Sequence, residues 1–204
     1  MYIEYLGHSC FYLKGKDRSV VTDPFGDIGF PLKRAECDFV LSSHGHFDHN
    51  NFDGVKAGRI ITETACGFNA IPCFHDEAHG KLRGKNNAFF FDLDGLRVLH
   101  LGDLGEPFTE ENAEKFKVGA DILFIPVGGN YTIDGATAAK YAKAIGAKVT
   151  VPMHYKTRFN KIDISDPQDF LSSFENFNTV ENGFEITADN IENFSPVTFI
   201  KFQE

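Results

Sequence analysis

A ten-residue stretch, "LSSHGHFDHN", places three histidines and an aspartate between positions 44 and 49. The whole chain contains only eight histidines, so this clustering needs a reason. Neighbouring imidazoles repel one another when protonated and gain little from one another when neutral. Imidazole and carboxylate ligands suit zinc, with iron, manganese and nickel as alternatives. The stretch therefore predicts a site for divalent metal ions.

The spacing within this stretch allows for two metal positions. His44 and His46 are separated by one residue, so in an extended turn both imidazoles can point the same way. Asp48 and His49 then begin a helix-like turn and can face a second position nearby. One loop could thus provide ligands to two metal ions.

Four other segments place a histidine or aspartate where an expected strand ends: "VVTDPF" with Asp23, "IPCFHDEAHG" with His75 and His79, "HLGDLG" with Asp103, and "VPMHY" with His154. In order and placement, these motifs and "HGHFDH" resemble the metallo-β-lactamase superfamily over nearly the whole chain. The flanks "LGHSCF", "IPVGGNYTID" and "VPMHYK" resemble its small single-domain, zinc-dependent hydrolases related to ascorbate-6-phosphate lactonase.

The resemblance implies seven ligands, all histidine or aspartate, divided between two ions. The first ion would be held by His44, His46 and His75, the second by Asp48, His49 and His154, and Asp103 would bridge them. Asp48 could also take up a proton during the reaction. Asp23 would accept a hydrogen bond from a ligand imidazole and fix its tautomer. As an aspartate before proline, Asp23 could instead only cap a turn.

Other histidines are harder to place from the sequence. His75 directly follows the apolar run 71–74, whereas His79 lies in a polar loop. We expect His75 to be the third ligand of the first ion, and the sequence leaves His79 as the alternative. His8 would lie near the metals in the resembling branch, so its place in the pocket stays open. His100 lies inside a strand and is expected to be structural.

Two loops are candidates for the substrate pocket. Backbone N–H groups of "GGNYT" (128–132) could meet an anion, although a plain turn needs no such role. The segment "HGKLRGKNN" carries Lys81, Arg83 and Lys85. Arg83 could clamp a phosphate or carboxylate, or the loop could simply be solvated.

Two ions roughly 3.5–4 Å apart would bind a water between them and lower its pKa toward neutrality. The resulting metal-bound hydroxide would attack a carbonyl carbon or a phosphorus. The local positive charge would favour anionic substrates despite a net charge of −9. The predicted protein is thus a dinuclear hydrolase of a small, anionic ester, lactone or phosphodiester.

Three other functions stay open. Di-iron redox proteins share the fold, but typically have a glutamate where this chain has His46, and often an additional flavin domain. Nucleases of the superfamily typically add an inserted domain or a basic arm, neither of which is apparent. A metal-binding protein without turnover is the third alternative. Self-association into a homo-oligomer is expected from the resemblance alone.

Composition sets further limits. A chain of 204 residues with 42% apolar residues is expected to form one domain, 1–204. The acidic balance and the lack of a basic run argue against nucleic-acid binding. There is no apolar run near 18 residues and no signal-peptide pattern, so we expect no membrane span and a cytoplasmic location. The four cysteines lack CxxC pairing and are expected to be buried, reduced thiols.

The elements that must position these residues are strands first and β-α-β units later. The expected strands are 2–6, 10–13, 19–22, 39–42, 59–62, 70–74, 88–92, 97–101, 121–127, 148–153 and 197–202, with "DLDGL" as a hairpin turn. The expected helices run from the Thr109 cap to Gly119, over 134–145, and from a capping box at 165–168. This order suits an α/β fold, a four-layer αββα sandwich of the metallo-β-lactamase type.

Overall fold

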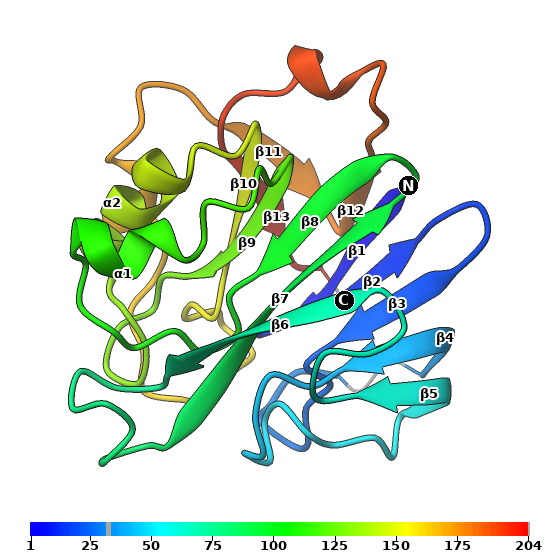
Figure 1. The fold of residues 1–204 in the computed structure, drawn as a ribbon, viewed down its shortest axis with the longest axis horizontal. Helices are drawn as coiled ribbons and strands as arrows, with labels where there is room; N and C mark the ends of the chain where they lie inside the picture. The colour runs from blue at the N-terminus through cyan, green and yellow to red at the C-terminus, as the bar shows by residue number, and fades with distance from the viewer. Residues whose placement is uncertain (32–33, 204) are drawn as a thin grey trace.

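The computed structural model describes residues 1–31 and 34–203, which form two sheets and a small third one (Figure 1). The six-stranded sheet has the order β12 (Gly183–Glu185), β1 (Tyr2–Gly7), β2 (Cys10–Lys14), β3 (Ser19–Thr22), β4 (Ala35–Leu41), β5 (Val55–Ile61). The five-stranded sheet has the order β10 (Val149–Met153), β9 (Ile122–Pro126), β8 (Leu96–His100), β7 (Lys85–Leu93), β6 (Phe68–Phe74). The pair β11 (Asn178–Glu181) and β13 (Thr198–Lys201) is parallel.

Aromatic side chains join the two large sheets. Phe11 of β2 lies 4.4 Å from Phe124 of β9 between ring centroids, and Phe39 of β4 lies 5.1 Å from Phe68 of β6. Phe11, Phe68 and Phe124 are fully buried. The core therefore lies between the sheets, and many of the numerous phenylalanines pack there.

The α-helices gather beside the five-stranded sheet: α1 (Glu110–Glu114), α2 (Gly135–Ile145) and α3 (Gln168–Leu171). Figure 1 shows α1 and α2 next to β9. Asp134 caps α2 by accepting a hydrogen bond from the Thr137 N–H at 2.8 Å, and Gly146 ends it with a φ of 71°. Its buried alanines let it approach β9, all of whose residues are buried. The predicted α/β sandwich is confirmed.

Two local predictions concern a hairpin turn and the end of a helix. The hairpin "DLDGL" is confirmed, because Leu93 pairs with Leu96 across Asp94 and Gly95, which both have positive φ. The helix expected as far as Gly119 ends at Glu114, and i→i−3 hydrogen bonds continue the chain as turns.

Other predictions were wrong. The capping box expected at 165–168 does not form, because the Ser165 N–H donates to the Gly128 carbonyl and the Gln168 N–H donates to the Asp166 carboxylate. Cys66 is exposed, although Cys10, Cys37 and Cys73 are buried, and all four thiols are free. The short strands β11 and β12 and the 3₁₀ helix η1 (Ile191–Asn193) were not predicted. In the described part of the chain, no helix combines the length and apolar character needed to cross a membrane.

Strand direction brings the ends of distant segments together. β1 and β3 are both antiparallel to β2, and β4 is parallel to β3, so β1, β3 and β4 run in one direction. β6 and β8 are both antiparallel to β7, and β9 and β10 are parallel to β8. Each sheet therefore presents several carboxyl ends at one edge, where α/β proteins usually build their sites.

Candidate metal centre

The candidate site residues follow these carboxyl ends. His8, Asp23, His75 and His154 come directly after β1, β3, β6 and β10, the loop 42–50 follows β4, and Asp103 follows β8. All of them except His44, His46 and Asp48 are buried. The two sheets thus contribute side chains to one cluster from segments far apart in the sequence.

Three of these residues have a left-handed backbone. The φ angles are 57° at His8, 38° at Asp23 and 53° at His154. Positive φ is uncommon in non-glycine residues and persists only where the surroundings hold it. The N–H of His154 donates to the carbonyl of His8 at 2.9 Å, which ties the end of β10 to the end of β1. This bond fixes two candidate ligands from different sheets relative to each other.

Asp103 lies at the centre of the cluster. Its Oδ2 is 3.1 Å from Nε2 of His49, and 3.2 Å from Nε2 of both His75 and His154. Burial alone would raise the pKa of Asp103, but the nearby His154 and His49 hold it well below its usual range. Asp103 is therefore a carboxylate surrounded by three imidazoles, as a bridging ligand would be.

His44, His46 and His75 form the first cluster, in which one potential ligand atom of each residue lies within 4.8 Å of the others. Nδ1 of His75 donates to the Tyr131 carbonyl at 3.1 Å. The Ser43 hydroxyl donates to Asp23 at 2.8 Å, so it accepts from Nδ1 of His44, 2.9 Å away. Both tautomers thus leave Nε2 free to bind a metal.

His8, Asp48, His49 and His154 form the second cluster by the same 4.8 Å criterion. Nδ1 of His49 contacts Oδ2 of Asp23 at 3.1 Å, which directs Nε2 toward Asp103. Burial opposes protonation of His49, but Asp103 and Asp23 outweigh it and raise its pKa. His8 adds a histidine to the ligands expected here, with its Nε2 3.5 Å from Oδ2 of Asp48.

Buried polar atoms without a hydrogen-bond partner indicate whether these residues can bind a metal ion. Within the described residues, eight buried side-chain nitrogen and oxygen atoms lack a hydrogen-bond partner. Five of them belong to the two clusters, from His8, His44, His49 and His154, and a sixth is an oxygen of Asp103. Burying such atoms is costly unless something binds them. Burial also lowers the pKa of His8 to about 4 and that of His44 to about 3, as neutral ligands require. The donor set fits divalent metal ions.

Two histidines lie outside the clusters. His100 is buried, and both ring nitrogens have protein partners, since Nε2 donates to the Ser9 carbonyl and Nδ1 accepts from the Gly102 N–H, each at 3.1 Å. His79 is exposed, with its ring nearly perpendicular to that of Phe74. Neither belongs to a group of potential metal ligands among the described residues.

A cavity of about 550 Å³ opens over the clusters. It is lined by His46, Phe47, Asp48, His75, Leu82, Arg83, Asp103, Tyr131, His154, Lys161, Ile162 and Asp163. Lys81 does not line this cavity, and Lys85 lines a different one. In "GGNYT", the N–H groups of Gly129, Tyr131 and Thr132 donate within their own turn, so these three are not available to an anion.

Asp76 is not among the site residues predicted from the sequence, although it shapes the cavity wall. Its carboxylate accepts hydrogen bonds from four backbone N–H groups, those of Ala78, Gly80, Leu82 and Arg83, at 2.7–3.1 Å. Burial would raise the pKa of Asp76, but these four bonds lower it. The signal available in the sequence was an aspartate directly after His75 and before a glycine-containing loop.

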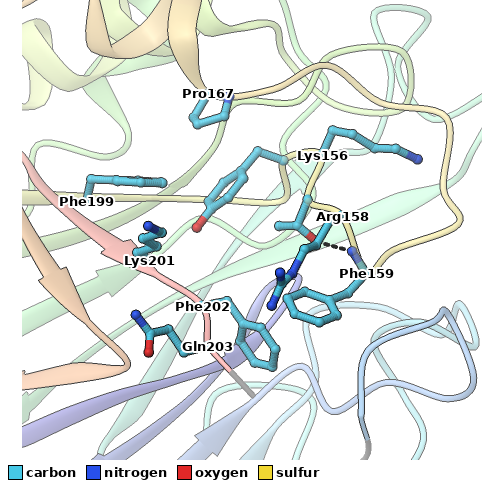
Figure 2. A pocket seen from close by; sticks show the side chains of 10 residues that line it. Lys156, Arg158, Phe159, Pro167, Phe199, Lys201, Phe202 and Gln203 are labelled. Carbon is cyan, nitrogen blue, oxygen red and sulfur yellow. Dashed lines mark hydrogen bonds between the residues drawn. The ribbon is translucent and has the colours of Figure 1, made fainter.

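A slightly larger cavity, of about 610 Å³, lies elsewhere (Figure 2). Aromatic and basic residues line it, among them Arg158, Phe159, Phe199 and Lys201. Among the described residues, no histidine, cysteine or carboxylate lines it, so volume alone does not identify the functional site.

Comparisons with known proteins identify the family to which this chain belongs. Residues 2–154 match the family described as beta-lactamase superfamily domain. A UPF0173 metal-dependent hydrolase of Methanoculleus marisnigri is 32% identical, over 77% of this chain and 82% of its own length. One from Methanoregula boonei is 29% identical, over 86% and 90%. The crystal structure of a Thermotoga maritima protein, named as a Zn-dependent hydrolase of the metallo-beta-lactamase superfamily, has a TM-score of 0.79 and 33% identity, with 99% of each chain covered.

Proposed function

Because the chain belongs to the metallo-β-lactamase superfamily and is a metal-dependent hydrolase, we propose that it uses two divalent metal ions to hydrolyse a small, anionic ester, lactone or phosphodiester. The observation that carries this proposal is the pair of ligand clusters on either side of Asp103. Zinc is the proposed metal, and manganese, iron and nickel are alternatives. We also propose one domain over 1–204, a cytoplasmic location, self-association, and no nucleic-acid or membrane partner.

The proposed ligands are His44, His46 and His75 for one ion, Asp48, His49 and His154 for the other, and Asp103 for both. His8 is a further ligand or neighbour of the second ion, since neither of its buried ring nitrogens has a hydrogen-bond partner among the described residues and its Nε2 faces Asp48. Asp23 orients His49, and the Tyr131 carbonyl orients His75. These contacts hold the Nε2 atoms in place before a metal binds.

Divalent ions would supply Lewis acidity toward the substrate and make water a nucleophile near neutral pH. Asp48 lies at the cavity with a partly exposed side chain, so its carboxylate can take the proton that the attacking water loses. That proton then passes to the leaving oxygen, and an acid and an alcohol, or the corresponding phosphate products, are released. Arg83 lines the same cavity and can pair with the anionic group of the substrate.

Elemental analysis of the untagged protein, together with hydrolysis assays, tests this function. We expect about two zinc or manganese ions per chain and hydrolysis of at least one ester, lactone or phosphodiester, because the ligands form two clusters. Two irons that change redox state, without hydrolysis, would favour the electron-transfer alternative. One metal or none, after careful handling, would contradict the dinuclear site.

His75 and His79 can be distinguished by parallel substitution. His75→Ala is expected to lower metal content and reduce hydrolysis by about 100-fold or more, because His75 lies with His44 and His46. His79→Ala is expected to keep both, because His79 is exposed and outside the clusters. Metal counts per chain and hydrolysis rates, measured side by side, check this. Loss of metal only in His79→Ala would move the ligand to position 79.

A further inference from the structure

Exposed apolar side chains collect around the mouth of the metal centre. The exposed large hydrophobic residues of the described chain are Phe47 (67%), Leu82 (63%), Tyr131 (39%), Ile60 (46%) and Phe177 (42%). The two most exposed, Phe47 and Leu82, line the cavity over the clusters, as does Tyr131. Scattered exposed apolar residues need no explanation, but a group around a polar metal centre does. We call Phe47, Leu82 and Tyr131 the apolar rim.

Each member of the apolar rim is held by backbone contacts. Phe47 lies between two candidate ligands, and its carbonyl accepts from the Gly26 N–H at 3.2 Å. The Leu82 N–H donates to Asp76 at 3.1 Å. Tyr131 accepts the hydrogen bond from His75 on its carbonyl, and its ring lies at the cavity. The rim is therefore built into the same loops that orient the metal ligands.

The Arg83 side chain places a positive charge beside this rim. The Arg83 guanidinium lies 5.7 Å from the centre of the Tyr131 ring. Lys161, which lines the same cavity, is 3.6 Å from Asp27. Within 1–31 and 34–203, no carboxylate forms an ion pair with Arg83. A guanidinium held over an aromatic ring next to apolar side chains suits an anionic group on an otherwise apolar molecule.

We infer that the substrate of this site is an ester or lactone whose acyl part is a medium-length apolar chain or a ring, carrying one carboxylate or phosphate for Arg83. The inference rests on the proposed hydrolase function and narrows its substrate class. A cavity of about 550 Å³ is within the usual range for such a molecule. Hydrolysis adds water across the acyl C–O bond, so an ester releases the apolar acid and an alcohol, and a lactone opens to a single hydroxy acid.

The test uses the metal-loaded protein and three probes: 4-nitrophenyl acetate, 4-nitrophenyl octanoate, and the mono-4-nitrophenyl ester of suberic acid. We expect kcat/KM for the octanoate and suberate esters to exceed that for acetate by about tenfold or more, because the chain contacts the apolar rim. Phe47→Ala and Leu82→Ala should each reduce the ratio of kcat/KM for octanoate to that for acetate several-fold, and this ratio is the readout whatever each variant does to the acetate rate itself. Arg83→Gln should lower the ratio of kcat/KM for the suberate ester to that for the octanoate ester about tenfold.

Matched control variants come from exposed residues away from this cavity. Phe177→Ala, Ile60→Ala and Arg158→Gln, the last from the cavity in Figure 2, should change none of these ratios. Calorimetric titration with suberate gives a readout independent of turnover, and Arg83→Gln should weaken that binding about tenfold. If no ester is hydrolysed but suberate still binds and this binding depends on Arg83, the hydrolase function is contradicted. The role of the apolar rim and Arg83 in binding would then still stand.

Equal kcat/KM for short and long esters would overturn the inference, as would Phe47→Ala behaving like Phe177→Ala. Light scattering tests the other explanation of the apolar rim, which is a contact between copies of this chain. If Phe47→Ala lowers the molar mass in solution while chain length has no effect on rate, the rim is a contact between copies of this chain and not a substrate site.

Discussion

Replacing Asp103 with alanine is expected to abolish hydrolysis, with a loss of roughly a thousandfold or more, equivalent to about 4 kcal/mol in the activation barrier. Asp103 is buried, and its Oδ2 lies 3.1–3.2 Å from three imidazole nitrogens from separate segments. Its removal would leave the two proposed cations without the anion that reduces their repulsion. Hydrolysis rates and metal counts per chain measure both consequences.

The variant Asp103→Asn distinguishes the effect of losing the negative charge from the effect of losing side-chain volume. The amide preserves volume but lacks the negative charge, so we expect a similar loss of metal and rate. Asp121→Asn is the control, because Asp121 precedes β9 and so lies at the opposite end of the sheet, where it accepts a hydrogen bond from the Arg97 N–H. Full activity and metal content in Asp103→Asn would exclude Asp103 as a bridging ligand.

His154→Ala is expected to remove one of two metal ions and lower hydrolysis by about 100-fold or more. His154 lies in the second cluster, and with few ligands left the ion there would dissociate. The φ of 53° at this position also strains alanine, so His154→Gly is the informative companion, because glycine adopts that backbone freely. Both variants should lose the same metal.

His79→Ala is a matched control for this variant as well, since His79 has a φ of 56° but is exposed and outside the clusters. It should retain both metal ions. If His154→Ala kept full activity and unchanged metal content, His154 would not be a ligand, and His8 would become the remaining second-site histidine next to His49.

Much of the fold could be predicted because its signals are local. Apolar runs ending at Asp23, His75 and His154 marked where strands stop, and those ends are where the structure gathers the candidate ligands. The hairpin at Asp94 and Gly95 and the caps of α2 follow from the backbone preferences of single residues.

The unpredicted features depend on tertiary partners. The four amides that bind Asp76 and the Tyr131 carbonyl that orients His75 are generic backbone groups, which leave no trace in residue type. Ser165 fits the sequence pattern of a capping box, but its N–H donates instead to the carbonyl of Gly128, a tertiary partner. The rim of Phe47, Leu82 and Tyr131 is assembled from three loops, so only folding brings it together.

One buried carboxylate fixes the conformation of the loop that follows His75. Asp76 accepts hydrogen bonds from the backbone amides of residues 78, 80, 82 and 83. Backbone amides are the same in nearly every residue, so the side chains at 77, 81, 82 and 83 can change while the loop keeps its shape. Such a loop is suited to evolutionary diversification and to engineering. Libraries at these positions can alter substrate preference while the neighbouring His75 stays in place.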